Sequence, residues 1–441
     1  MARKLFGTDG VRGIAGDVLT ADLALALGRA ATAEIAGEHP RPRVLVIRDT
    51  RESGEMLEAA LASGVAAAGG EVLLGGVLPT PAAPLLINRY GIDLAAVISA
   101  SHNPYRDNGI KFFGGDGFKL SDATELAIER RLEAGPPAPA DGAGPRIGRV
   151  RAFHGTQEDY LRELHARFDG LDLSGVRVLL DCANGATYKV APEVFRRLGA
   201  DVTVLAEQPD GRNINDGCGS THVEALAAHM DGHDIGFAFD GDGDRVLAVD
   251  RNGTVVDGDE LLALAVLHRK AKGVVVTVMT NYGFHNAMRD AGVETAITKV
   301  GDRYVLEELR RRGDGWALGG EQSGHIIDMG FVPSGDGIAA ALLTLESLEG
   351  GDLADRTAMV KLPQKLVNVR VADRDAAMGS DELADAIAQA TQELEGRGRV
   401  LVRPSGTEQL VRVMTEAPTA EEADQVCARL VAVVERTATG V

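Results

Sequence analysis

The feature that most constrains the fold is a layout that the chain repeats three times. In each copy an apolar run is followed by a polar loop, a helical stretch, a glycine and a second apolar run. The copies begin at residues 44–47, 176–180 and 274–279. Short apolar runs that alternate with amphipathic helices indicate βαβ units and mainly parallel sheets. We therefore predict three similar α/β domains in succession.

Each copy also ends in the same way. A second helical stretch and a third predicted strand lead into a loop rich in functional groups, at residues 99–104, 240–245 and 320–325. Ligands of open α/β sheets bind beyond the carboxyl ends of the strands. Three such loops at matching positions are therefore expected to converge on one cleft.

The remainder of the chain departs from this layout. From about Leu366 the order is strand, helix, strand, strand, helix, which is typical of a smaller α+β domain. We predict an α/β fold in which three similar α/β domains with mixed, mainly parallel sheets and a smaller C-terminal α+β domain surround a central cleft. The expected domain boundaries are residues 1–150, 151–252, 253–365 and 366–441.

The formal net charge of −19 narrows the range of partners. Such a charge repels nucleic acid and anionic membrane surfaces, so neither is an expected partner. The cysteines Cys182, Cys218 and Cys427 are far apart and form no C-x-x-C motif, which fits a reducing compartment. No apolar stretch is long enough to span a membrane, and the N-terminus has no secretory signal. We therefore expect a cytoplasmic protein.

A triple-aspartate loop is the clearest candidate metal site. Asp240, Asp242 and Asp244 alternate with glycines directly after an apolar run. In an extended segment, period two would place all three carboxylates on one side, and the glycines let the backbone curl so that the oxygens converge. Three like charges this close are unfavourable without a cation, and Mg²⁺ is the usual ion where phosphate also coordinates. An EF-hand calcium loop is excluded because Arg245 and Arg251 stand where that loop requires Gly and Glu.

Ser101 is the candidate nucleophile. It follows an apolar run, and its neighbours His102, Asn103 and Pro104 form a polar loop. Taken alone, such a serine is more often a turn residue. Adjacent residues of an extended chain point to opposite faces, so His102 is not expected to be the base for Ser101. Beside a metal loop and phosphate-binding loops, a phosphorylated Ser101 is the better interpretation, because Mg²⁺ can neutralise a phosphoryl group.

The C-terminal domain contains a candidate phosphate-binding loop. Arg403, Ser405, Gly406 and Thr407 offer a guanidinium, two hydroxyls and a nest of N–H groups, which suit a phosphate monoester. Arg412 on the following predicted strand could add charge. A turn with a surface arginine is the alternative.

Other loops carry groups suited to a sugar and its reacting phosphate. Glu321 and Ser323 offer an acceptor and a donor for sugar hydroxyls, and His325 could shuttle protons or contact phosphate. Arg12 lies among glycines near the N-terminus, and Lys111 lies just after the serine loop. Each of these residues has a structural interpretation as well, and their joint occurrence favours the functional one.

The order of these loops resembles the α-D-phosphohexomutase superfamily over essentially the whole chain. The resemblance rests on a serine loop, a triple-Asp loop, a Glu-x-Ser-Gly-His loop and an Arg-Pro-Ser-Gly-Thr loop in family order. Residues 6–13 and 213–222 are most similar to the members that act on glucosamine phosphates. Gln409 stands where the family usually has proline. The resemblance implies four domains around a central cleft, the first three alike, in agreement with the repeated layout.

The resemblance also implies a role for each loop. Ser101 would carry the phosphoryl group and, with Asp240, Asp242 and Asp244, hold one Mg²⁺. The remaining roles fall to three sets: Arg12, Lys111, Arg245 and His325 around the reacting oxygen; Glu321 and Ser323 on the sugar; and Arg403, Ser405, Gly406, Thr407 and Arg412 on the phosphate that is not transferred.

The implied reaction interconverts glucosamine 6-phosphate and glucosamine 1-phosphate for cell-wall precursor synthesis. It would use two phosphoryl transfers through a sugar 1,6-bisphosphate, with glucosamine or glucose 1,6-bisphosphate as activator. The alternatives are phosphomannomutase or phosphoglucomutase activity with the same machinery, a sugar-phosphate phosphatase, and a non-catalytic sugar-phosphate sensor. The sequence sets no oligomeric state, and a homodimer is compatible with it.

Overall fold

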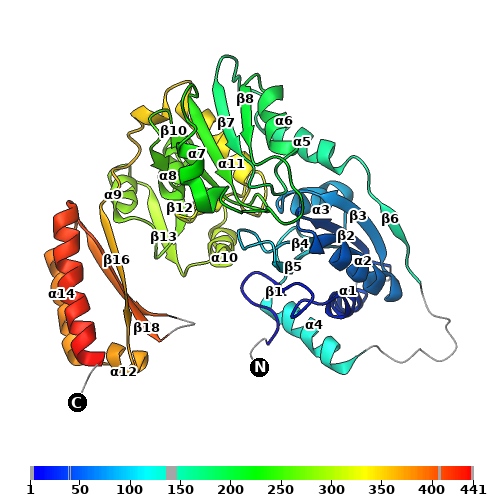
Figure 1. Ribbon diagram of the computed structural model, residues 1–441, viewed down its shortest axis with the longest axis horizontal. Helices are drawn as coiled ribbons and strands as arrows, with labels where there is room; N and C mark the ends of the chain where they lie inside the picture. Colours follow the sequence, from blue (N-terminus) through cyan, green and yellow to red (C-terminus); the bar gives the residue numbers. More distant parts are fainter. Residues whose placement is uncertain (1–3, 38, 40, 136–146, 406–408, 439–441) are drawn as a thin grey trace. The chain divides into compact units, whose positions relative to one another are not determined.

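The computed structural model describes residues 4–37, 39, 41–135, 147–405 and 409–438. Contacts divide the chain into two compact units, Met1–Val278 with Ala296–Arg356, and Met279–Thr295 with Thr357–Val441. Figure 1 shows the elements of both units, which are described one at a time. Within the described ranges, no helix is long and apolar enough to cross a membrane.

The first domain consists of β1 (Val11–Ile14), α1 (Ala21–Ile35), β2 (Arg43–Arg48), α2 (Ser53–Ala67), β3 (Glu71–Val77), α3 (Ala82–Tyr90), β4 (Leu94–Ile98), β5 (Asp107–Gly114), α4 (Asp122–Ala134) and β6 (Val150–Ala152). Its strands lie in the order β1-β5-β4-β2-β3-β6. β2 is parallel to β3 and β4, whereas β5 is antiparallel to β4 and to β1. β4 is buried along its whole length, as expected for a strand covered on both faces.

The second domain consists of α5 (Thr156–Arg167), β7 (Arg177–Asp181), α6 (Val190–Arg197), β8 (Asp201–Leu205), the 3₁₀ turn η1 (Ser220–His222), α7 (Val223–Ala227), β9 (Ile235–Phe239), β10 (Val246–Asp250) and β11 (Val255–Val256). Its strand order is β11-β10-β9-β7-β8. β7 is parallel to both β8 and β9, and β10 is antiparallel to β9.

The third sheet repeats this arrangement with fewer strands. The elements of the third domain in the first unit are α8 (Gly258–His268), β12 (Gly273–Thr277), α10 (Asp302–Arg312), β14 (Leu318–Gly320), β15 (Ile326–Asp328), α11 (Gly337–Leu348) and η2 (Leu353–Asp355). The division of the sequence into units falls within β13 (Glu294–Thr298). The strand order is β13-β12-β14-β15. β12 is parallel to β14, and β15 is antiparallel to β14.

The three sheets place one functional loop each at the same structural position. β4, β9 and β14 are each parallel to the first strand of their own sheet's βαβ unit, and each is followed by an antiparallel partner: β5, β10 or β15. The loop between the two strands is the serine loop, the aspartate loop or the Glu321 loop. The predicted α/β domains with mainly parallel sheets are thus confirmed, and the repeated layout extends to the position of these loops.

The second unit contains the smaller α+β domain. The domain's elements are β16 (Gln364–Arg370), α12 (Arg374–Met378), α13 (Asp381–Glu393), β17 (Arg399–Pro404), β18 (Leu410–Glu416) and α14 (Ala420–Ala438), and the unit also includes α9 (Tyr282–Asp290). The sheet β16-β18-β17 is antiparallel throughout. Helix α14 contacts β16 and β18 and runs beside them in Figure 1. This confirms the predicted C-terminal α+β domain, while the exact domain boundaries stay a prediction.

Candidate active site

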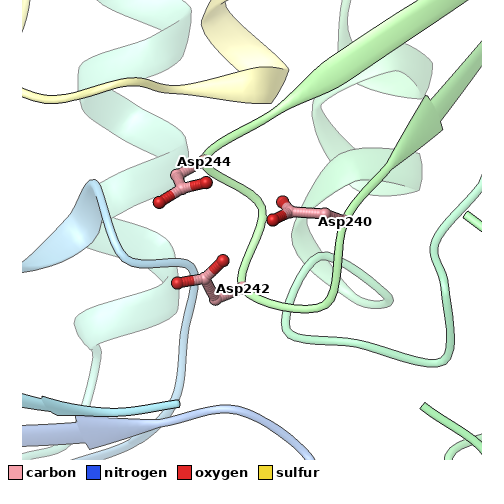
Figure 2. A group of neighbouring side chains, drawn as sticks. All are labelled: Asp240, Asp242 and Asp244. Carbon is pink, nitrogen blue, oxygen red and sulfur yellow. The ribbon is translucent and has the colours of Figure 1, made fainter. Parts of the chain in front are cut away.

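The aspartate loop joins β9 to β10 and gathers three buried carboxylates. Asp240, Asp242 and Asp244 are at most 5% exposed, and one oxygen of each lies within 4.8 Å of the others. Figure 2 shows the three side chains turned toward a common space. The segment curls, as its glycines led us to expect: the Gly243 N–H donates to the Asp240 carbonyl, and Gly243 has φ 71°. The carboxylates converge because the loop turns.

The turn is closed by that one backbone hydrogen bond, whose N–O distance is 3.1 Å. Its tightness depends on Gly243, because a residue with a side chain rarely adopts a positive φ. An added Cβ at Gly243 would also lie 2.5 Å from the Thr187 side chain. The glycines of this loop therefore serve the close grouping of the carboxylates.

The three buried carboxylates lie close enough to repel one another. Burial, together with the charges of Asp244 and Asp242, raises the pKa of Asp240 well above its ordinary range. Asp242 accepts hydrogen bonds from Lys111 Nζ at 2.7 Å and from Thr80 Oγ1 at 2.6 Å. The Oδ1 atoms of Asp242 and Asp244 are buried without a hydrogen-bond partner among the described residues. Buried carboxylate oxygens without partners are costly, and a divalent cation would satisfy them.

Ser101 lies in the loop between β4 and β5 and faces this cluster. Its side chain is buried, and its Oγ donates a 2.6 Å hydrogen bond to Oδ2 of Asp240. Its φ of 53° is left-handed, which is uncommon for serine and costs free energy on the order of 1 kcal/mol. Strained backbone of this kind persists where the surroundings hold it, and it turns the hydroxyl toward the metal loop.

A buried arginine holds the serine loop in this conformation. Arg51, just beyond β2, donates from Nη2 to the carbonyls of Ser101 and Asn103, each at 2.9 Å. Its Nε donates to Asp49 at 2.8 Å, and both side chains are fully buried. Asn215 Nδ2 also donates to the Ser101 carbonyl at 2.9 Å. These hydrogen bonds hold the backbone of the serine loop and thereby the position of the Ser101 hydroxyl.

The expected separation of Ser101 and His102 is wrong. Ser101 Oγ and His102 Nδ1 lie 3.2 Å apart, because the left-handed backbone at Ser101 breaks the alternation of an extended chain. Burial, followed by the charges of Arg245 and Arg12, lowers the pKa of His102. The neutral form of His102 is therefore favoured beside the serine, and its Nδ1 also lies 3.3 Å from Arg245 Nη1.

Lys111 and Arg12 lie on adjacent strands. β1 and β5 pair with Arg12 opposite Gly109, which brings Lys111 of β5 into the interior. Lys111 is 2% exposed and also lies 3.5 Å from Asp244 and 3.9 Å from Asp9. Burial alone would lower the pKa of Lys111, but the carboxylates of Asp242, Asp9 and Asp244 outweigh it and raise the pKa. Arg12 forms an ion pair with Asp9.

The third-domain loop holds Glu321 and His325 inside and Ser323 outside. Glu321 Oε1 accepts from the Gly301 N–H at 2.9 Å, whereas Ser323 is exposed. His325 is buried, with Nδ1 3.5 Å from Asp244 and Nε2 3.6 Å from Asp302. Burial lowers the pKa of His325, but the two carboxylates outweigh this and raise it.

Arg245 connects the aspartate loop with its surroundings. Its backbone N–H donates to Asp240 Oδ1 at 3.1 Å, and its guanidinium lies 3.9 Å from Asp244. The carboxylates of Asp244 and Asp240 raise the pKa of Arg245 against the opposing effect of burial. The structure thus brings together Ser101, the three aspartates, Lys111, Arg245 and His325. Their catalytic roles stay a prediction.

The candidate phosphate loop lies in the second unit. Arg403 and Arg412 are direct partners across β17 and β18, and Arg412 Nε is buried without a hydrogen-bond partner among the described residues. Burial, and then the charge of Arg412, lowers the pKa of Arg403. Like charges opposite each other are destabilising unless an anion joins them. The Ser405 carbonyl accepts from Arg374, while Gly406 and Thr407 lie outside the described residues.

Several residues of the site have no counterpart among the sequence predictions. Asp49 and Arg51 follow the carboxyl end of a strand, a position at which polar residues could have been singled out. Asp9 and Asn215 lie within the two segments that carry the family resemblance, without an assigned role. Lys119 had no local signal at all, because its partners lie far away in the sequence. The residues concerned are Asp9, Asp49, Arg51, Lys119, Asn215 and Asp302.

Comparison with known families gives four matches in chain order. The models are described as phosphoglucomutase/phosphomannomutase alpha/beta/alpha domains I, II and III and the C-terminal domain. They match residues 3–138, 158–253, 257–363 and 366–433.

Individual proteins match over nearly the whole chain. A phosphoglucosamine mutase of Moorella thermoacetica is 50% identical, with 99% of each chain covered, and one of Desulforudis audaxviator is 52% identical, with 94% of each covered. Among solved structures, a phosphoglucomutase/phosphomannomutase family protein of Burkholderia thailandensis has a TM-score of 0.81 at 24% identity, with 98% of each chain covered. N-acetylphosphoglucosamine mutase of Aspergillus fumigatus, in complex with GlcNAc-6P and magnesium, has a TM-score of 0.70 at 18% identity, covering 99% of this chain and 96% of that one.

Proposed function

We propose, from the premise that the chain belongs to the phosphoglucosamine mutase family, that it interconverts glucosamine 6-phosphate and glucosamine 1-phosphate. The family follows from identities near 50% over nearly the full length of both chains. The chain is accordingly an isomerase that acts by phosphoryl transfer. The residues and intermediates below are our proposal for how this site performs that reaction.

The observation that carries the proposal is the hydrogen bond between Ser101 and Asp240. It places a buried hydroxyl 2.6 Å from a carboxylate of the triad, with Lys111 2.7 Å from a second. A hydroxyl in this position suits a phosphoryl carrier, because cations surround the place where phosphate oxygens would lie. We therefore assign Ser101 as the phosphoserine.

The reaction then consists of two transfers. The 1-hydroxyl of glucosamine 6-phosphate attacks the phosphorus of phospho-Ser101, so that an O1–P bond forms and the Oγ–P bond breaks. The resulting 1,6-bisphosphate turns over in the site. Ser101 Oγ then attacks the 6-phosphate, which restores the phosphoserine and leaves glucosamine 1-phosphate with a free 6-hydroxyl.

Each transfer moves one proton from the attacking hydroxyl to the leaving oxygen. His325 is suited to hold that proton, because Asp244 and Asp302 flank its two ring nitrogens. Lys111, Arg12 and Arg245 stay charged and stabilise the phosphoryl oxygens as charge develops. Catalysis therefore rests on positioning and charge, as in other phosphoryl transfers.

The aspartate triad fits a divalent cation, and we propose one Mg²⁺ per chain. The Oδ1 atoms of Asp242 and Asp244, which accept no hydrogen bond among the described residues, and an oxygen of Asp240 are the kind of ligand that Mg²⁺ prefers. An oxygen of the phosphoryl group on Ser101 would complete the set. When bound, the ion neutralises phosphate charge. A magnesium complex of the Aspergillus enzyme supports the choice of ion.

Two further groups would hold the substrate. Glu321 and Ser323 are assigned to the sugar hydroxyls. The facing pair of Arg403 and Arg412, with Ser405, Gly406 and Thr407, is assigned to the phosphate that is not transferred. That phosphate is at position 6 in one transfer and at position 1 in the other. The same phosphate-binding residues must therefore accept both orientations of the sugar.

Product analysis tests this function. The protein is incubated with glucosamine 6-phosphate, Mg²⁺ and a trace of glucose 1,6-bisphosphate as activator, and the products are resolved by phosphorus NMR. We expect glucosamine 1-phosphate. Release of inorganic phosphate instead would make the protein a phosphatase, and absence of both products would make it a sugar-phosphate binding protein. Glucose and mannose phosphates in parallel would reveal a different sugar preference.

A further inference from the structure

Side chains of alternating charge form a closed ring within the first unit. Six residues from all three α/β domains take part, and side chains with nitrogen groups alternate with carboxylates around the ring. The nitrogen–oxygen distances around the ring are Lys111–Asp9 3.9 Å, Asp9–Lys119 2.6 Å, Lys119–Asp302 2.5 Å, Asp302–His325 3.6 Å, His325–Asp244 3.5 Å and Asp244–Lys111 3.5 Å.

Half of this ring lies outside the residues assigned to the reaction above. Asp9 sits in a tight turn in which the Gly7 N–H donates to the Gly10 carbonyl at 2.9 Å. Gly10 permits this turn, because its φ is 79° and an added Cβ would lie 2.4 Å from the Ile110 carbonyl oxygen. Asp302 is the first residue of α10. Lys119 bridges these two carboxylates.

Lys119 is the member of the ring with the shortest contacts on both sides. Its side chain is only 11% exposed, and its Nζ donates to Asp9 of the first domain and to Asp302 of the third. Burial lowers the pKa of Lys119, but Asp302 and Asp9 outweigh it and raise the pKa. One cation therefore compensates two partly buried carboxylates at once.

The two carboxylates in turn face the reacting groups. Asp9 pairs with Arg12 and lies near Lys111, and Asp302 lies beside His325. Without the charge of Lys119, both carboxylates would be attracted more strongly to the remaining cations. Arg12, Lys111 and His325 would then be drawn from their present positions toward Asp9 and Asp302.

We propose that Lys119 is a positioning residue for phosphoryl transfer, acting through Asp9 on Arg12 and Lys111 and through Asp302 on His325. This inference rests on the proposed mutase function. It differs from a purely structural role for Lys119, in which the ion pairs only join the first and third domains. In that case substitutions would change stability, while the turnover of folded protein would stay the same.

The experiment compares Lys119→Met, which keeps length but removes charge, with Lys119→Arg, which keeps the charge. The matched control is Lys365→Met, which removes an ion pair with Asp424 at 3.0 Å outside the ring. kcat and KM for glucosamine 6-phosphate are measured on folded protein. In Lys119→Met we expect kcat to fall about 30- to 100-fold and KM to change less than about threefold. Lys119→Arg should retain most of the wild-type kcat.

Asp302→Asn tests the ion pair between Lys119 and Asp302 by removing the carboxylate. It replaces Lys119→Met as the test if that variant does not fold. It should show the same selective fall in kcat. The double variant should lose less than the product of the two single losses, because the two side chains act as a pair. If wild type turns over and Lys119→Met or Asp302→Asn has the same kcat as the control, this inference is overturned and the proposed function stands. The same holds if the losses of kcat in the two single variants multiply fully in the double variant. Wild type that yields no isomer would overturn the proposed function and this inference with it.

Discussion

The Oγ of Ser101 lies 2.6 Å from Oδ2 of Asp240, so the serine hydroxyl is hydrogen-bonded to the first carboxylate of the metal-type cluster. A phosphoryl group on Ser101 would bring further negative charge to that carboxylate. The pair therefore requires a cation in the phosphorylated state. This relationship connects the serine loop of the first domain with the aspartate loop of the second.

Removal of one charge from the triad should weaken metal binding. Asp242→Asn keeps the size of the side chain and its contact with Thr80, but it removes a charged ligand. We expect Mg²⁺ affinity, measured by titration calorimetry, to fall about tenfold or more, and chelation to stop turnover of wild type until Mg²⁺ is restored. The control is Asp290→Asn, on an exposed side chain. Wild-type turnover in excess chelator would refute the metal site.

A methyl group beside His325 should disturb the reaction more than the fold. An added Cβ at Gly335 would lie 2.4 Å from His325 Nε2, so Gly335→Ala must displace the imidazole. We expect kcat to fall about tenfold or more and stability to fall by about 1–3 kcal/mol. Gly170→Ala is the control, because its Cβ would meet no atom within 4 Å. Equal activity of the two variants would show that the position of His325 does not matter.

Arg403 should serve binding more than chemistry. If it holds the phosphate that is not transferred, its contact changes little between ground and transition state. Arg403→Ala should therefore raise KM about tenfold, with a smaller fall in kcat. Arg397→Ala, which removes an ion pair with Glu422, is the control in steady-state kinetics. A fall in kcat with unchanged KM would instead place Arg403 among the reacting groups.

His285 of α9 should make stability depend on pH. Burial, with the charge of Arg399, lowers the pKa of His285 to about 4, whereas the unfolded value is about 6.5. A pKa depressed in the folded state means that stability is fully present above about pH 6.5 and is lost as the pH falls toward 4.

Between about pH 7.5 and about pH 5, wild type should lose about 2 kcal/mol more stability than His285→Gln. Denaturant unfolding followed by circular dichroism, with each transition fitted separately, measures this difference. His229→Gln, on an exposed side chain, should follow wild type. Equal pH dependence of wild type and His285→Gln would show that His285 is protonated as readily in the folded chain.

The sequence predicted the elements and loops whose causes are local. Apolar periodicity identified the parallel strands, and the alternation of aspartate and glycine identified the triad. The glycines also indicated that the aspartate loop can curl, and Gly243 has a positive φ. The sequence wrongly separated Ser101 from His102, which a positive φ at Ser101 brings together. Backbone conformation of this kind is imposed by distant donors such as Arg51, and a local pattern does not contain them.

The charge ring was beyond sequence reasoning for a similar reason. Lys119 and Asp302 are far apart in the chain and belong to different domains, so neither residue marks the other. The repeated layout predicted that the first three loops converge, and the family resemblance gave each loop its role. The role of the second-unit loop with Gly406 and Thr407 stays a prediction. Tertiary contacts over long sequence distances decide which of many surface-type charges become buried pairs.

The central claim is that Ser101 carries the phosphoryl group during turnover. Its most direct test uses enzyme incubated with glucose 1,6-bisphosphate labelled with ³²P, followed by digestion and mass spectrometry of the labelled peptide. We predict label on Ser101, its transfer to added glucosamine 6-phosphate, and neither label nor turnover in a folded Ser101→Ala variant. Active wild type without label on Ser101, or near-normal turnover in Ser101→Ala, would contradict the account.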